Sequence, residues 1–203
     1  MDSSTLPENT KEILDKLKGK EFIKKFYLSG GTALALQLGH RESIDLDFFS
    51  QDLFDPKSIQ IELEKLADLK DLSQDRGTLN CFMEGTQLQF LHYPYKLLED
   101  LIEWEGVYLS SVLDIACTKL ITVSARGSKK DFIDLFFLLQ KYDLNFLFEK
   151  LKEKYESTDY NLQHILKSLV YFEEARSEPM PKMHRLLVWE DVEKMLIKVT
   201  KEL

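Results

Sequence analysis

The chain has 203 residues, with 27 Lys and Arg against 35 Asp and Glu, which gives a formal net charge of -8 at pH 7. A surface this acidic repels phosphate backbones, so the composition excludes a general polyanion binder. At 44% hydrophobic and 31% charged residues, the chain is also no disordered tail, and its length predicts one domain or two small ones. The acid excess is local, since residues 41–113 carry 6 bases and 15 acids.

The thiols and the start of the chain indicate a compartment. Cys81 and Cys117 form no spacing motif and are expected to be core residues in a reducing environment. The residues after Met1 lack the basic and apolar character of a signal peptide, and no apolar run reaches membrane-spanning length. The sequence therefore predicts a cytoplasmic protein that has no membrane partner.

The first half of the chain predicts alternating helices and strands. In chain order the expected elements are a helix over 11–20, a strand over 26–28, a helix over 32–36, a strand over 44–48, a helix over 56–66, a hairpin of strands 79–83 and 88–92, and a strand over 107–109. Asp55 followed by Pro56 is typical of a helix start.

The second half is expected to be helical. Ser111 with Asp114, and Ser128 with Asp131, have the spacing of capping boxes ahead of two helices. Further helices are predicted over 144–155, 160–175 and 189–202. We therefore expect an α+β fold, with an α/β core over residues 1–110 and a helical domain over 111–203.

Two acidic residues alternate with apolar ones in the segment 44–48. On an extended backbone Asp45 and Asp47 share one face, while Ile44, Leu46 and Phe48 are expected to point into the core. Two adjacent carboxylates repel unless a hard cation such as Mg²⁺ lies between them. The alternative is a solvent-facing strand whose polar face happens to be acidic.

A glycine pair precedes this strand. Gly30-Gly31-Thr32 joins a predicted strand to a predicted helix, and a helix start of this kind has backbone N–H groups that an anion can approach closely. Taken alone the pair could be a simple tight turn. Together with Asp45 and Asp47 on the next strand, it predicts a metal held by carboxylates and bridging nucleotide phosphates. The acidity of residues 41–113 would favour that metal.

Four charged residues lie on the two helices predicted after Ser111. Lys119 and Arg126 lie seven residues apart on one edge of the first helix, and Asp131 and Asp134 lie on the second. Half-buried carboxylates need partners, so a structural ion pair between the helices is one interpretation. The other is a phosphate-binding patch, because the segment from Lys119 to Lys130 holds four bases and no acid.

Taken in order, these residues resemble the AbiEii/AbiGii toxin family of nucleotidyltransferases over about residues 20–140. The motifs that carry the resemblance are Gly30-Gly31-Thr32-Ala33-Leu34, then Arg41, Ser43, Asp45 and Asp47, then Asp114-Ile115-Ala116 with Lys119, and finally Arg126, Lys130, Asp131 and Asp134. The resemblance implies a polymerase-β-like nucleotidyltransferase core, a small mixed sheet with helices, followed by a helical C-terminal half that contributes to the active-site cleft.

The resemblance also implies an activity. Such a protein would transfer a nucleoside monophosphate from a nucleoside triphosphate to an RNA (tRNA) or protein hydroxyl, as the toxin of a bacterial toxin–antitoxin system. The resemblance implies two partners, an antitoxin and the acceptor end of tRNA. The local basic patch would bind the tRNA.

Site roles follow from the same resemblance. Asp45 and Asp47 would hold Mg²⁺, and Lys119 and Asp131 would complete the catalytic set. Nucleotide contacts would come from Gly30, Gly31, Thr32, Ser43, Arg126 and Lys130, with Arg41 and Asp134 supporting them.

One position departs from the pattern. Nucleotidyltransferases of this fold usually carry a third carboxylate on a later strand, and the matching strand here has Gln89. A neutral amide gives the metal site one negative charge fewer and removes a base for the attacking hydroxyl. Either Asp131 takes over that duty or activity is impaired, which leaves a nucleotide-binding module as the alternative. A third hypothesis is that the protein is a helical interaction protein.

Overall fold

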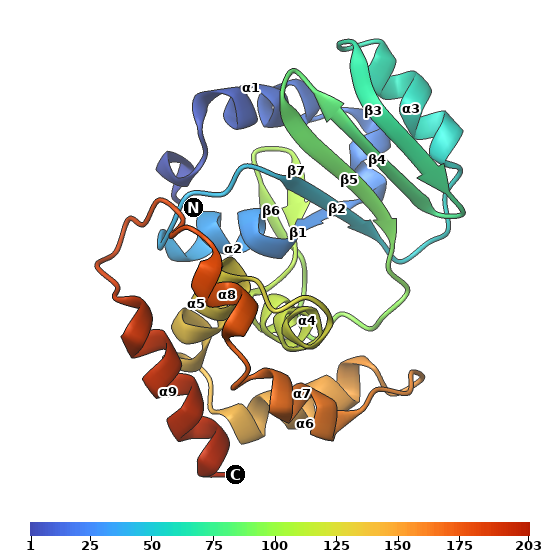
Figure 1. The fold of residues 1–203 in the computed structure, drawn as a ribbon. Coiled ribbons are helices and arrows are strands. Elements are labelled where there is room, and N and C mark those ends of the chain that lie inside the picture. The colour runs from blue at the N-terminus through green and yellow to red at the C-terminus, as the bar shows by residue number, and fades with distance from the viewer. The chain divides into compact units, whose positions relative to one another are not determined.

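The computed structural model describes residues 1–203 and divides them into two compact units. We call them the sheet unit, residues 1–95 and 100–111, and the helical unit, residues 96–99 and 112–203 (Figure 1). Residues 96–99 belong to the helical unit although their chain neighbours on both sides belong to the sheet unit. The expected boundary at residue 110 thus lies one residue from the observed one, but that short segment was not foreseen.

A seven-stranded mixed sheet forms the first unit, with strand order β3-β4-β5-β2-β1-β7-β6. Its strands are β1 (Tyr27–Ser29), β2 (Leu46–Ser50), β3 (Leu69–Asp75), β4 (Thr78–Met83), β5 (Thr86–His92), β6 (Ile102–Trp104) and β7 (Val107–Leu109). The helices are α1 (Glu8–Leu17), α2 (Gly30–Leu38) and α3 (Pro56–Glu64), with 3₁₀ turns at Ser3–Thr5 and Glu21–Lys25. β2 pairs antiparallel with β1 and parallel with β5.

Local turn chemistry explains several of these elements. Asp55 caps α3 by accepting a hydrogen bond from the Lys57 N–H, and Pro56 occupies the first helical position. The β4–β5 hairpin turns at Glu84 and Gly85, which both have positive φ angles (49° and 85°). A two-residue turn of that kind matches the twist of the paired strands. The predicted helix start and the predicted hairpin are therefore confirmed.

Aromatic packing forms the centre of the sheet unit. Phe48 of β2 stacks on Phe90 of β5 with ring centroids 5.1 Å apart, and Phe26 meets Phe90 edge to face at the same distance. All three rings are almost fully buried. Burying a phenylalanine side chain contributes about 1.5–3 kcal/mol, so this cluster fixes the register of β2 against β5.

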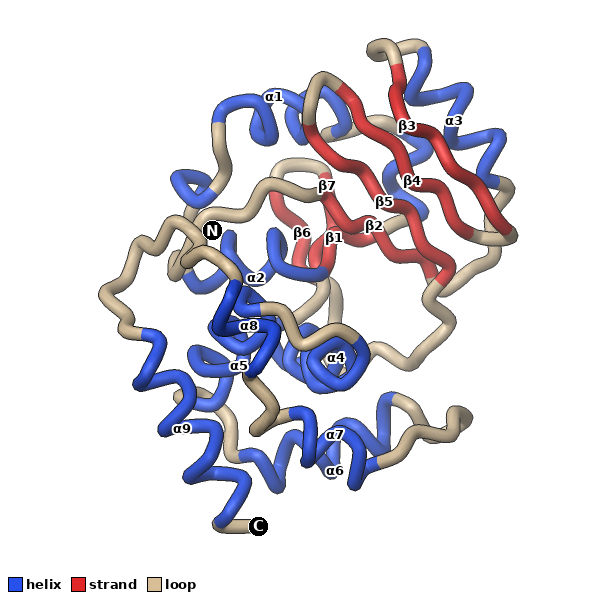
Figure 2. Tube along the Cα trace, viewed as in Figure 1, coloured by secondary structure: helices blue, strands red, loops and turns tan.

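The second unit is all helical, as Figure 2 shows in blue and tan. It contains α4 (Val112–Ala125), α5 (Lys129–Leu139), α6 (Leu144–Lys154), α7 (Leu162–Ser168), α8 (Glu173–Ser177) and α9 (Trp189–Lys201). α4 packs against α5, α6 and α7, and α5 packs against α8 and α9. No helix of the protein combines the length and the apolar character that crossing a membrane requires.

Three expectations need correction. The strand expected to start at Ile44 starts at Leu46, so Asp45 lies just before it and the Ile44 side chain is 58% exposed. Two strands were not predicted, Leu69–Asp75 and Ile102–Trp104. The helix expected over 160–175 is two short helices. The Asp114 carboxylate accepts hydrogen bonds from the N–H groups of Leu98 and Glu99, which the sequence did not indicate.

Candidate functional site

The first candidate element is the start of α2, directly after β1. Gly30 has a positive φ of 64°, and a Cβ atom built on it would collide with the Asp47 carboxylate. Register explains this closeness, because Ser29 at the end of β1 pairs with Asp47 on β2. Only glycine combines this backbone angle with so close an acidic neighbour. The predicted glycine turn and the predicted acidic pair therefore lie together.

A buried arginine lies at the same helix start. A Cβ atom on Gly31 would lie 2.7 Å from a terminal nitrogen of Arg41 and 3.3 Å from the Ser43 hydroxyl. Arg41 is almost fully buried, and its guanidinium donates a hydrogen bond to the Glu42 carbonyl at 2.9 Å. A helix N-terminus already carries partial positive charge. Adding a guanidinium there makes the position electrostatically suited to an anion.

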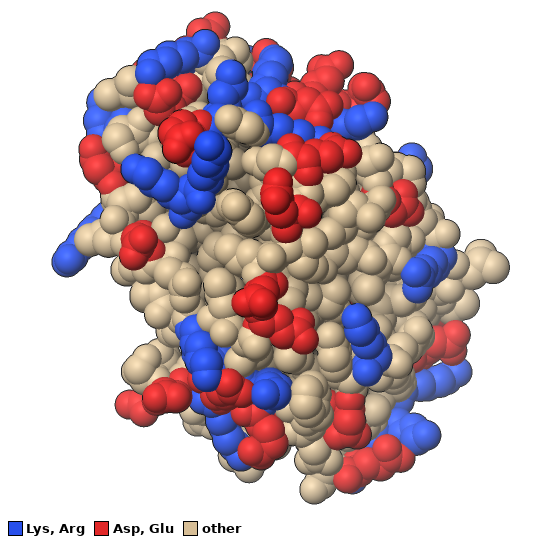
Figure 3. Space-filling view, turned by 180° about the vertical axis from the view of Figure 1, so that it is seen from behind, with Lys and Arg blue, Asp and Glu red and all other residues tan.

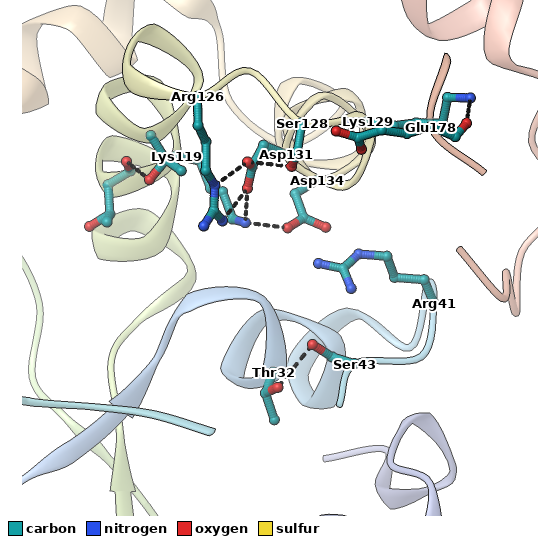
Figure 4. A network of polar contacts seen from close by, with 12 residues as sticks. Thr32, Arg41, Ser43, Lys119, Arg126, Ser128, Lys129, Asp131, Asp134 and Glu178 are labelled. Carbon is teal, nitrogen blue, oxygen red and sulfur yellow. Dashed lines mark hydrogen bonds and ion pairs between the residues drawn. The ribbon is translucent and has the colours of Figure 1, made fainter. Parts of the chain in front are cut away.

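Thr32 fastens the acidic loop to the helix. Its buried hydroxyl donates to the backbone carbonyl of Asp45, and it lies 2.9 Å from the Ser43 hydroxyl (Figure 4). These bonds hold the segment before β2 beside the start of α2. Thr32 and Ser43 therefore help to position this loop, and their direct contact with phosphate stays a prediction.

A row of polar side chains crosses the sheet at the level of Asp47. Register places Asp47 of β2 beside Gln89 of β5, and Gln89 beside Asn80 of β4. Residues paired in this way project from the same face. The Gln89 amide donates to the Asn80 side-chain oxygen at 2.8 Å. The neutral residue noted in the sequence thus lies on the strand next to the acidic pair.

The second candidate element joins α4 to α5 inside the helical unit. The Lys119 ammonium lies 2.7 Å from one carboxylate oxygen of Asp131 and 2.6 Å from Asp134. Arg126 donates to both oxygens of Asp131, at 2.8 and 3.2 Å (Figure 4). The Ser128 hydroxyl donates to Asp131 at 2.6 Å. The charged residues predicted on these two helices form one cluster.

Burial and charge act in opposite directions on Asp131. The carboxylate is inaccessible to solvent, which by itself raises its pKa, but Lys119 and Arg126 outweigh burial and hold the pKa well below its ordinary value. Asp131 is therefore ionised throughout the physiological pH range. With its oxygens taken by Lys119, Arg126 and Ser128, it is suited to positioning these groups rather than to acting as a base.

The predicted basic patch is not an open surface. Lys119 is buried against the two aspartates, and Lys129 is buried with its ammonium donating to the backbone carbonyls of Glu178 and Arg176. Arg126 keeps a side-chain exposure of 57% while paired with Asp131. Lys130 lies in the first turn of α5 and is partly exposed. On the face drawn in Figure 3, acidic and basic side chains are interspersed.

Sequence reasoning missed one buried ion pair. Lys154 of α6 lies 2.6 Å from Asp114 of α4, and both are almost fully buried. Lys154 also donates to the backbone carbonyl of Lys96 at 2.9 Å. Asp114 and Lys154 thereby fasten segment 96–99 to the helical unit. A usable signal was that Lys154 continues the apolar spacing of Leu147 and Leu151 in the same helix.

The acidic pair offers the oxygen ligands that a hard cation prefers. Asp45 and Asp47 are both partly exposed, and no group of three or more His, Cys, Asp or Glu residues in the protein is arranged to hold a metal ion. Mg²⁺ is commonly held by one or two carboxylates together with substrate phosphates. Two carboxylates beside an anion-binding helix start match that chemistry.

Solved structures share this fold. A candidate nucleotidyltransferase from Helicobacter pylori aligns with a TM-score of 0.60 at 15% identity, covering 100% of this chain and 95% of that one. The nucleotidyltransferase toxin MenT4 from Mycobacterium tuberculosis H37Rv aligns with a TM-score of 0.53 at 15% identity, covering 89% and 76%. The fold is therefore that of the nucleotidyltransferases, an N-terminal mixed sheet with a helical C-terminal half.

Sequence comparison then gives the family. Residues 12–80 match the model described as the nucleotidyl transferase AbiEii toxin of type IV toxin–antitoxin systems. A protein of Aquifex aeolicus (strain VF5), described as uncharacterized, is 39% identical over 203 residues and covers 97% of both chains. The chain belongs to the AbiEii nucleotidyl transferase toxin family, as the motifs predicted.

Proposed function

We propose that this protein transfers a nucleoside monophosphate from a nucleoside triphosphate to a hydroxyl group of an RNA, with tRNA as the first candidate, or of a protein, and that this transfer makes it toxic. One observation carries the proposal. The start of α2 packs Gly30 against the Asp47 carboxylate and Gly31 against the Arg41 guanidinium. Cation-binding and anion-binding groups thus meet at a single helix start.

The triphosphate would bind at this helix start. Backbone N–H groups of Gly30 and Gly31 and the guanidinium of Arg41 offer donors to phosphate oxygens. Asp45 and Asp47 would hold Mg²⁺, which when bound neutralises charge on the phosphates during transfer. Thr32 keeps the Asp45 backbone in place through its hydrogen bond to the carbonyl.

The helical unit carries a charge cluster of its own, which would bind an anionic group of a substrate. Arg126 is the exposed cation of the cluster, and two hydrogen bonds to Asp131 fix the direction of its guanidinium. A preorganised guanidinium stabilises charge that develops in the transition state without reorganising. Lys119 contributes charge from a buried position, and Asp131 and Asp134 hold both cations.

The test is label transfer by the purified full-length protein. Each α-labelled nucleoside triphosphate is incubated with Mg²⁺ and, in separate arms, total tRNA or a protein lysate. We expect labelled product in one arm and at least a hundredfold loss in the Asp45→Ala, Asp47→Ala double variant. Asp52→Asn is the matched control. Asp52 follows the same strand and is exposed, and it bonds to the Ser50 hydroxyl through its backbone N–H and carbonyl groups.

The outcomes separate the candidate functions. Transfer that survives in the double variant contradicts the proposal. If calorimetry shows nucleotide binding but no acceptor is labelled, the result supports the alternative of a nucleotide-binding module, which Gln89 suggested. Expression that arrests growth, and that Asp45→Ala relieves, links the transfer to toxicity. A neutralising antitoxin, the partner implied by a type IV system, is then sought by co-expression.

A further inference from the structure

The sheet face beside the acidic pair carries the Gln89 amide where related enzymes usually have a carboxylate. We propose that Gln89 is a neutral third ligand of the metal ion held by Asp45 and Asp47, and that Asn80 orients it. The inference rests on the proposed function, because it concerns the same metal.

Register supplies the first argument. Asp47 and Gln89 are paired residues of neighbouring parallel strands, so their side chains leave the same face about 4.8 Å apart at the backbone. Two ligands of one Mg²⁺ ion, each about 2.1 Å from it, lie at most about 4.2 Å from each other. Side chains on adjacent strands reach that separation. Asn80 is one strand further away, about 10 Å from Asp47, and is too distant to share the ion.

Hydrogen-bond direction supplies the second argument. The Gln89 amide nitrogen donates to the Asn80 oxygen at 2.8 Å, and the Asn80 nitrogen in turn donates to the Ser73 hydroxyl at 3.5 Å. The three residues are paired in register across β5, β4 and β3. Because the amide nitrogen of Gln89 points toward Asn80, its side-chain carbonyl oxygen is the atom that would bind the metal ion. An amide carbonyl is a suitable oxygen ligand for a hard cation.

The neighbour on the other side of Asp47 offers no comparable ligand. Ser29 of β1 is paired with Asp47, but it is buried and its hydroxyl accepts a hydrogen bond from Ser110 at 2.8 Å. Gln89 is partly exposed. The ligand set that the chain provides is thus two carboxylates and one carbonyl, and substrate phosphates and water fill the remaining positions.

Metal affinity tests the inference directly. Mn²⁺ binding to the full-length protein is measured by electron paramagnetic resonance of the free ion, with a non-hydrolysable nucleoside triphosphate present. We expect Gln89→Ala to raise the Kd for Mn²⁺ by about 10–100-fold, and Asn80→Ala to raise it by no more than that, because Asn80 acts only by orienting Gln89. Gln89→Glu should strengthen binding because it adds charge. The control is Gln87→Ala, on the same strand and face but paired with Phe82.

A double-variant cycle distinguishes orientation from general destabilisation. If Asn80 acts through Gln89, then Asn80→Ala has no further effect on the Kd in the Gln89→Ala background. Unchanged Mn²⁺ affinity in Gln89→Ala, with folding verified by circular dichroism, overturns the inference. If Asp47→Ala also leaves the affinity unchanged, the proposed metal site itself fails. If only Asp47→Ala weakens Mn²⁺ binding, Gln89 is not a ligand, but the proposed function is not contradicted.

Discussion

Replacing Lys119 by methionine probes the buried charge cluster most directly. In the intact protein two cations, Lys119 and Arg126, face two carboxylates, Asp131 and Asp134, and both carboxylates are inaccessible to solvent. Lys119→Met preserves much of the side-chain volume but leaves Asp134 without its ammonium partner at 2.6 Å. Within the cluster, one of its two cations is then lost, and Arg126 alone remains against the two carboxylates.

The expected cost follows from burial. Breaking a buried ion pair by removing one partner costs about 3–5 kcal/mol, because the remaining charge stays desolvated. At about 2–4 °C per kcal/mol for a chain of this length, Tm should fall by about 6–20 °C. Lys152→Met is the matched control. Lys152 lies in the same unit and pairs with Glu149 at 2.8 Å, but it is well exposed, so its loss should cost at most about 1 kcal/mol.

The loss of Tm in Lys119→Met should also depend on pH. In the wild type the pKa of Asp131 is held below its ordinary value, so its stabilising contribution is present above the unfolded pKa and is lost as pH falls through the folded one. In Lys119→Met, protonating a carboxylate relieves the repulsion between Asp131 and Asp134. The Tm difference between wild type and variant should therefore shrink from pH 7 to pH 4. A Tm within 2 °C of wild type at pH 7 would refute the buried-pair reasoning.

A charge-balanced variant separates stability from chemistry. Lys119→Met with Asp134→Asn removes one charge of each sign and should recover part of the lost Tm. If Lys119 also serves nucleotidyl transfer, the recovered protein stays inactive in the label-transfer assay. Recovery of both Tm and transfer would assign Lys119 a purely structural role.

Two further predictions concern backbone and thiols. Gly30→Ala should abolish Mn²⁺ and nucleotide binding, because its Cβ would displace the Asp47 carboxylate, whereas Gly85→Ala should cost only stability, since φ is positive there too but nothing lies within 4 Å; calorimetry compares them. Burial raises the pKa of Cys81 to about 11 and that of Cys117 to about 12, so both thiols should stay protonated and unreactive toward a colorimetric disulfide reagent at pH 8. Rapid reaction of the folded protein would contradict that.

Features coded by a few consecutive residues could be predicted from the sequence. Asp55 with Pro56 and the glycine pair before α2 are such signals, because caps and turns depend on nearest neighbours. β3 was missed because its residues are mostly polar and exposed, so pairing with β4 stabilises it rather than an apolar pattern of its own. Ile44 was misplaced because alternation alone cannot locate the first paired residue of a strand.

The site was predictable only in part, and for the same reason. The acidic pair and the glycine turn are local motifs. The position of Gln89 beside Asp47 depends on the parallel register of β2 and β5, whose residues lie about 40 positions apart in the chain. The closeness of Arg41 to Gly31 and the full burial of Asp131 likewise depend on tertiary packing. Residue types were visible in the sequence, whereas their partners were not.

The acid excess of residues 41–113 has a different meaning in the structure than in the sequence. Asp71 and Asp75 are exposed on β3, an edge strand three places from β2, which puts them at least about 14 Å from Asp47. That separation exceeds the Debye length of about 8 Å at 0.15 M ionic strength but not the 30 Å at 0.01 M. Replacing both by Asn should therefore change the Mn²⁺ Kd less than twofold at 0.15 M and more at 0.01 M. A fivefold change at 0.15 M would mean that the acidity of the whole stretch, and not the local ligand set, determines metal binding.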